Sequence, residues 1–274
     1  MGSYYGIMKK IIILLFFFNI CFSQNMKVTY NYISKPDTVM VSQNTILYVE
    51  GSDSYFFSEA KYLSDSIIEA RKLNELKTGI PMSFKNLPED DVIYFLKKNN
   101  NLIEYYSTEF ENIFKYSESI NFNWQIMNEF KELNGYKVQK ATTNIFNRDF
   151  IAWFTESISI NDGPYKFKGL PGLIVEIYDT NKEHYFCMVG LENKKMDTSL
   201  LFRHKSIDIT KKKYQEYREQ YKKDPFQKIK SLMMSTGIKE IQSKKGNTVN
   251  MAEIIAEREK KLIKKYKNDN QIEK

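Results

Sequence analysis

The feature that most constrains the fold is a series of short runs of alternating apolar and polar residues between Met26 and Phe202. Residues 28–34 alternate with a period of two and are rich in β-branched and aromatic side chains, a pattern typical of strands. Residues 45–50 and 55–58 repeat this pattern on either side of the turn cluster 51–54, which predicts a hairpin. Short strands separated by turn signals favour antiparallel meanders over a parallel sheet.

The same signals predict further strands at residues 92–96, 102–107, 113–116, 136–143, 150–154, 173–178, 184–191 and 200–202. Residues 59–76 change to helical spacing, and residues 211–223 form a charged helix that Asp224-Pro225 ends. An apolar stripe from Met251 to Tyr266 predicts a last helix with Asn250 as N-cap. Packing on the sheet and lying on a membrane surface both fit this stripe.

The fold class predicted is therefore α+β: a mainly antiparallel twisted sheet with helices and a helical C-terminal region. A half-barrel is one form that such a sheet takes. Residues 24–202 form the predicted antiparallel β-rich domain, and residues 203–274 form a basic helical region packed on or beside it.

The N-terminus resembles an export signal. Met8-Lys9-Lys10 is a short basic segment, residues 11–18 are apolar without interruption, and Ser23 is a small residue at a plausible cleavage edge. These features predict a signal peptide over residues 1–23 and a mature chain from Gln24. A buried N-terminal element and a lipoprotein signal at Cys21 are the alternatives.

Positive charge gathers in the last third of the chain. Residues 203–274 hold 20 Lys and Arg against 10 Asp and Glu, a net charge of +10. This charge fits a solvated, lysine-rich region, and it also fits peripheral contact with anionic lipid head groups through the basic C-terminal helices. Nucleic acid is excluded as a partner because the chain is predicted to be exported.

The segment from Gly163 to Ile177 holds three of the 11 glycines and two of the 6 prolines. Leu170-Pro171-Gly172-Leu173 predicts a type II turn, because proline presets φ and glycine accepts the positive φ that follows. Gly169 adds another permissive position. We interpret the segment as a rigid corner that begins a core strand; the alternative is a loop that lines a ligand or partner site. The candidate site residues in and near it are Trp153, Tyr165, Gly169, Pro171 and Gly172.

The order of three blocks resembles the GLPGLI family of exported Bacteroidetes proteins, whose function is unassigned. The blocks are residues 135–142, residues 152–155 and the stretch from Gly163 to Ile174. Members often carry a cysteine where this chain has Val138. The resemblance implies an envelope protein of Gram-negative type, in the periplasm or associated with the outer membrane, and it supplies no catalytic residues.

The titratable residues predict no catalytic, metal or cofactor site. The two histidines, His184 and His204, lie in a strand pattern and a basic cluster, and a hydrolase triad needs one of them beside an activated nucleophile. The acidic run at residues 89–91 follows a proline and fits a helix start or a turn. Cys187, in an apolar run, fits a small core residue better than a reactive thiol.

Aromatic residues are frequent, with 19 Tyr, 19 Phe and 2 Trp. They fit either a large core without disulfides or a curved sheet that carries an apolar ligand, as exported carriers of lipidic ligands do by analogy of form. The first function hypothesis is a non-enzymatic envelope protein that binds a partner protein or an apolar ligand. The alternatives are an accessory protein of an outer-membrane system and an uncharacterised hydrolase.

Overall fold

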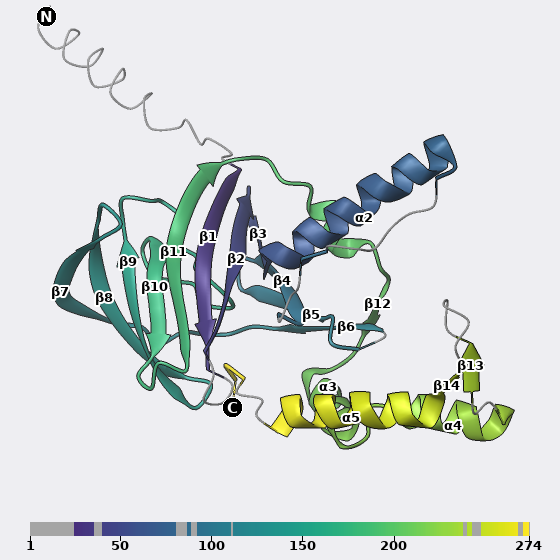
Figure 1. Cartoon of the computed structure of the whole chain (residues 1–274). Helices are drawn as coiled ribbons and strands as arrows, with labels where there is room; N and C mark the ends of the chain where they lie inside the picture. Colours follow the sequence, from purple (N-terminus) through teal and green to yellow (C-terminus); the bar gives the residue numbers. More distant parts are fainter. Residues whose placement is uncertain are drawn as a thin grey trace, which may run out of the picture.

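The structure is a computed structural model that describes residues 25–35, 40–80, 87–88, 92–110, 112–237, 240–242, 248–267 and 271–273. The predicted signal peptide, the start at Gln24 and the acidic run at residues 89–91 lie outside the described residues. The described residues form one large sheet with helices beside it (Figure 1).

Twelve strands form this sheet in the order β12-β6-β5-β4-β3-β2-β1-β11-β10-β9-β8-β7. Neighbouring strands are antiparallel, except that β12 runs parallel to β6. The sheet is curved and open (Figure 1), which confirms the predicted antiparallel α+β fold. The strands are β1 (Met26–Ser34), β2 (Val41–Glu50), β3 (Asp53–Ser58), β4 (Tyr94–Asn99), β5 (Leu102–Ser107), β6 (Ile113–Glu118), β7 (Gln125–Leu133), β8 (Tyr136–Ile145), β9 (Arg148–Thr155), β10 (Leu173–Asp179), β11 (His184–Asn193) and β12 (Ser206–Asp208).

The sheet consists of two meanders joined at one place. Strands β1 to β6 follow one another in both the chain and the sheet, and strands β7 to β11 do the same. The antiparallel pairing of β1 with β11 joins the two, and we call this pairing the seam. Tyr32 and Phe186 lie opposite each other there, with stacked rings 4.2 Å apart.

Side chains that alternate along each strand give the sheet two apolar faces. The inner face carries Tyr30 and Phe186, which belong to the larger core cluster. The outer face carries Phe57, which belongs to a smaller cluster. Helix α2 (Glu59–Thr78) and the 3-10 helix η2 (Thr198–Phe202) contact each other, and α2 contacts β2 and β3 on the outer side.

The connection between β9 and β10, residues 156–172, occupies the inner face. Phe167 is fully buried, and its ring lies 4.8 Å from that of Phe150 in β9. The ammonium group of Lys98 in β4, also fully buried, forms a 2.5 Å ion pair with Asp162 and donates to the Gly163 carbonyl at 2.8 Å. Burial lowers the pKa of Lys98, and Asp162 opposes this effect. The inner face is thus filled by the chain's own side chains.

The last third of the chain adds helices at the β6 end of the sheet. Helix α3 (Lys211–Lys223) contacts β6, and α5 (Met251–Lys267) contacts α3. Asn250 caps α5 as predicted, because its Oδ1 accepts from the Ala252 amide at 2.9 Å. Packing on the sheet is one of the two positions that fit the apolar stripe of α5; in the structure α5 lies along α3, which itself contacts β6. None of the described helices is long and apolar enough to cross a membrane.

Several local predictions differ from the structure. The predicted strand 200–202 is part of η2, because the Asp197 side chain accepts from the Ser199 amide at 3.0 Å and caps a helical turn. The sequence does not predict β7, whose residues are almost all exposed and lack apolar alternation. It also misses β12, α4 (Gln227–Thr236) and the small hairpin of β13 (Glu240–Gln242) and β14 (Thr248–Asn250).

Candidate peptide-binding site

Four parts of the chain meet beside β6: the end of β6 itself, the 156–172 connection, the start of α3, and residues 271–273, which we call the docked segment. The parallel β12 brings α3 to this place, and the Ile209 amide continues the ladder by donating to the Lys115 carbonyl at 2.9 Å. Thr210 then caps α3 through the Lys213 amide. Lys211, the first residue of α3, therefore lies beside Glu118 at the end of β6.

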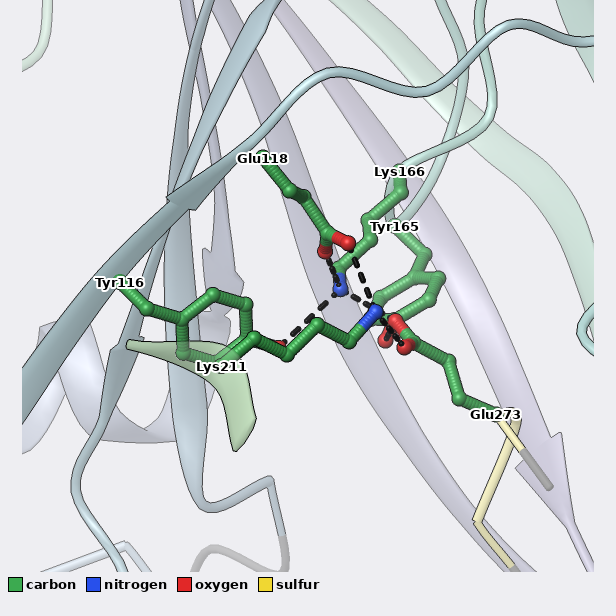
Figure 2. A network of polar contacts seen from close by, with 6 residues as sticks. All are labelled: Tyr116, Glu118, Tyr165, Lys166, Lys211 and Glu273. Carbon is green, nitrogen blue, oxygen red and sulfur yellow. Dashed lines mark hydrogen bonds and ion pairs between the residues drawn. The ribbon is translucent and has the colours of Figure 1, made fainter. Parts of the chain in front are cut away.

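Lys166 lies at the centre of this site, as Figure 2 shows. Its side chain is fully buried, and its ammonium group contacts Glu118, Glu273 and, at 3.3 Å, the Tyr116 hydroxyl. The rings of Tyr105, Tyr116 and Tyr165 surround it at 5.1, 5.4 and 5.3 Å. Aromatic faces and carboxylates both attract a cation, so this cage provides favourable contacts on several sides of the ammonium group.

Lys211 completes a ring of four charges. Its ammonium group lies 2.7 Å from Glu118 and 2.8 Å from Glu273, so each carboxylate bridges both lysines (Figure 2). Burial opposes ionisation of Glu273, but Lys166 and Lys211 outweigh it, and the pKa of this carboxyl is lowered. Burial likewise opposes the charge of Lys211, but Glu273 and Glu118 outweigh it and raise its pKa. Two positive and two negative charges therefore balance.

Other atoms of the docked segment are bound as well. The Gln271 carbonyl accepts from Arg148 Nη2 at 3.0 Å. With its amide oriented so that the oxygen faces donors, the Gln271 side chain accepts from Arg218 Nη2 at 2.9 Å. Ile272 is 5 % exposed and belongs to the inner-face core. Backbone, amide, apolar side chain and carboxylate each have a separate partner, which is how an extended peptide is recognised.

Arg148 connects the docked segment to a second buried group. Its Nη1 pairs with Asp179 at 2.9 Å and with Glu183 at 2.6 Å. Burial, together with the Arg148 charge, lowers the pKa of the nearby His184 to about 4, even though Asp179 opposes this effect. The imidazole is therefore neutral at pH 7, and its Nδ1 lies 2.9 Å from the Tyr32 hydroxyl.

Of the candidate residues predicted from the sequence, Tyr165 lies in this site. Its hydroxyl donates to Glu273 at 2.5 Å. Trp153 lies on the outer face of β9, with the Lys131 ammonium group 4.3 Å from its ring centre. Gly169 and Pro171 are exposed, and Gly172 is buried against backbone. The structure does not bring these other four residues together with Tyr165 in the site.

The predicted type II turn is wrong in its geometry. The Gly172 amide donates to the Leu170 carbonyl at 2.8 Å, which closes a three-residue turn around Pro171. Gly172 has a φ of 145°, and a Cβ there would lie 2.1 Å from the Thr155 carbonyl oxygen. Glycine is required because the start of β10 approaches the end of β9 this closely.

The sequence does not predict the charged residues of the site, which are Glu118, Lys166, Lys211 and Glu273. They are far apart in the chain and sit among many other lysines and glutamates. Of these four residues, Lys166 is the one that the sequence could have indicated, because it follows Gly163-Pro164-Tyr165 and is a charged residue between two aromatic residues. The parallel pairing of β12 with β6 brings Lys211 beside Glu118, and the docked segment brings Glu273.

The described residues contain no cluster of three or more His, Cys, Asp or Glu that could hold a metal ion. His204 is exposed, and no hydrogen bond joins it to Ser58 or Asp65 among the described residues, although all three line a small pocket of about 30 Å³. Cys187 is half-buried on the outer face, rather than in the core as predicted. The Glu89-Asp90-Asp91 run lies outside the described residues.

An open pocket of about 430 Å³ lies at the turn between β4 and β5. Six of the seven residues that line it have polar side chains, namely Lys97, Asn99, Asn100, Asn101, Glu104 and Ser119, and the seventh is Leu102. Pockets for apolar ligands are lined mainly by hydrophobic side chains. This surface therefore does not fit the predicted apolar ligand.

Comparison with known proteins identifies one family profile. Residues 146–176 match a Bacteroidetes-associated family described as "Protein of unknown function (Porph_ging)". The matched stretch runs from the end of β8 through the 156–172 connection to β10, and so includes Lys166. No curated protein matches the chain in sequence.

Among solved structures, two crystal forms of PNGF-II are similar to this chain. Each gives a TM-score of 0.52 over 70% of this chain and 32% of PNGF-II, with 16% and 17% identity. The chain thus spans about a third of the length of PNGF-II, and the likeness shows a shared fold over that part. A LolA superfamily protein from Nitrosomonas europaea gives a TM-score of 0.28 at 8% identity, over 65% of this chain and 90% of the other. That value is too low to support an argument.

Proposed function

We propose that this protein is a non-enzymatic binding protein of the bacterial envelope whose ligand is an extended segment of a partner protein. The observation that carries the proposal is the docked segment: four kinds of chemical group in three consecutive residues are each held by the folded domain. The charged groups of the site are paired with one another, so they serve recognition and not proton transfer.

The apolar-ligand version of the hypothesis has less support. The 156–172 connection fills the inner face with Phe167, Tyr165 and their aromatic neighbours. A lipidic ligand would need space that these side chains occupy. A partner protein needs a surface and a few anchor points, which the site supplies.

Export and placement in the periplasm or at the outer membrane follow from the signal-like residues 8–23 and from the resemblance to GLPGLI proteins. We assign the chain to that family on the order of its glycine and proline blocks. The match of residues 146–176 to a Bacteroidetes-associated family of unknown function supports the broader grouping.

Native mass spectrometry of the protein purified from its own envelope fraction tests the proposal. We expect a co-purifying protein mass, with no lipid adduct. A lipid mass released on unfolding would instead support the apolar-ligand version.

An accessory role in an outer-membrane system, through the basic helices α3 and α5, is the second candidate. It is favoured by the net charge of +10 over residues 203–274. Replacing the exposed lysines of α5 should then abolish partner recovery, while leaving α3 and its site residues in place.

A further inference from the structure

The docked segment supplies one of the two negative charges in the site. Without Glu273, the ammonium groups of Lys166 and Lys211 would face the single carboxylate of Glu118. With the docked segment in place the Lys166 side chain has no exposed surface, so Glu118 and Glu273 take the place of water around its ammonium group. When empty, the site is therefore a place of net positive charge that requires an anion.

The shape of the required anion follows from the contacts that Glu273 makes. Its two oxygens divide between the lysines, Oε1 toward Lys166 and Oε2 toward Lys211 at 2.8 Å, and Oε1 also accepts from the Tyr165 hydroxyl at 2.5 Å. A planar group with two oxygens matches these donors, and a carboxylate is such a group.

The neighbouring contacts extend this preference to a peptide. Immediately before the carboxylate residue, an apolar side chain enters the core, as Ile272 does. One residue earlier, a backbone carbonyl meets Arg148 and a side-chain amide meets Arg218. A free carboxylic acid would occupy only the position of Glu273 and would leave the positions of Ile272 and Gln271 empty.

We infer that this site recognises an extended acidic peptide in which an apolar residue precedes Glu or Asp, and that the docked segment is an internal occupant that such a peptide displaces. The inference rests on the proposed function, since it names the chemistry of the partner segment. It also adds regulation: the partner must compete with a segment of the same chain. The intramolecular occupant has the advantage of a high effective concentration.

Displacement can be measured on the unmodified protein. The δ1-methyl NMR signal of Ile272, assigned by its loss in Ile272→Val, reports whether the docked segment is bound. Adding a synthetic peptide with the sequence of residues 268–274 should move the chemical shift of this signal to the value of an unstructured isoleucine. The chemical shifts of core residues in β1 and β11 should not change. Free glutamate at the same concentration should not move it. An unmoved Ile272 signal at saturating peptide would overturn the inference.

Binding to an opened site is the second measurement. In Ile272→Ser/Glu273→Gln the internal occupant is weakened, and a fluorescent peptide of residues 268–274 should bind about tenfold or more tightly than to the wild type. Adding Lys211→Met to this variant should weaken binding by about tenfold or more. Lys212→Met, at the exposed neighbouring position, is the matched control and should leave binding unchanged. Equal binding with and without Lys211→Met would contradict the inference.

These results separate the inference from the proposed function. If Lys211→Met recovers the envelope partner as well as wild type does, the protein is a binding protein but this site is not where it binds. If the peptide displaces the docked segment and no envelope partner is found, the site stands as inferred and the proposed function fails.

Discussion

At the scale of single residues, Gly172 is the described glycine at which an added Cβ would lie closest to another atom. Its φ of 145° is rare for residues with a side chain, and a Cβ would overlap the Thr155 carbonyl. The clash is with backbone, which cannot turn aside as a flexible side chain does. Strain in the 156–172 connection would pass directly to the site, because Lys166 lies in the same connection.

We predict that Gly172→Ala lowers the free energy of unfolding by about 3 kcal/mol or more. Gly190→Ala is the control, because a Cβ there lies 3.6 Å from Thr29, an ordinary contact distance. It should change stability by less than about 1 kcal/mol. Urea unfolding of the two variants and the wild type measures both effects. Equal stability of the two variants would show that β9 and β10 are not packed as closely as described.

Single residues also mark where sequence-based reasoning succeeds. Tyr165 is predicted as a site residue because it lies in a glycine- and proline-rich segment, where the backbone is fixed locally. Lys211 and Glu273 carry no comparable local signal, because their role depends on a pairing between distant segments. Trp153 is conspicuous by its size, but its position in β9 puts it on the opposite face from the site.

At the scale of elements, the β10–β11 hairpin carries a proton-sensitive group. His184 in β11 is neutral in the folded protein, with its pKa lowered to about 4 by burial and by Arg148. The ordinary pKa of histidine, which we take for the unfolded chain, is about 6.5. Between these two values the unfolded chain binds a proton that the folded protein excludes, so acidification favours unfolding.

We predict that His184 makes the protein about 2 kcal/mol less stable at pH 5 than at pH 7. The contribution is fully present above pH 6.5 and is lost as the pH falls toward 4. His184→Gln should remove this part of the pH dependence, whereas His204→Gln, at an exposed position, should keep it. Urea unfolding at the two pH values measures the difference. Parallel pH curves for His184→Gln and wild type would contradict the prediction.

Elements with alternating side chains are the part of the fold that the sequence predicts well. Strands β8, β9 and β11 alternate buried and more exposed side chains, whereas β1, β2, β3, β5 and β10 also have stretches that are buried on both faces. Both kinds of strand are visible in the residues, as alternating or as continuous apolar runs. Strand β7 has no such pattern, because neither face is buried. The predicted strand at residues 200–202 is wrong because three apolar residues in a row fit a strand and a short helix equally well.

At the scale of the whole molecule, the protection of backbone amides from hydrogen exchange should fall from the seam toward the β7 edge of the sheet. Strand β1 is paired on both sides, with β2 and β11, and most of its side chains are buried. Strand β7 is paired only with β8, and its register with β8 shifts between Ile126 and Phe130. Separating β7 from β8 exposes little apolar surface to water, whereas separating β1 from β2 and β11 exposes apolar surface of both meanders.

We predict that backbone amides of β1 exchange with solvent at least about 100-fold more slowly than those of β7. Hydrogen exchange followed by NMR or mass spectrometry at pH 7 measures this. Strand β8, which shares the β7 ladder but has buried side chains such as Val138, should be intermediate. Uniform exchange across β1, β7 and β8 would mean that the sheet opens only as one unit.

The seam has a consequence for how the chain acquires its structure. Each meander is built from neighbours in sequence and can form early, but the Lys27–Glu192 ion pair across the seam joins residues 165 positions apart. Contacts of such long range form slowly, because the intervening chain must be ordered first. Until β1 and β11 meet, each half has an open edge that strands of other molecules can join. The interval before that meeting is when a newly made chain is most exposed to aggregation.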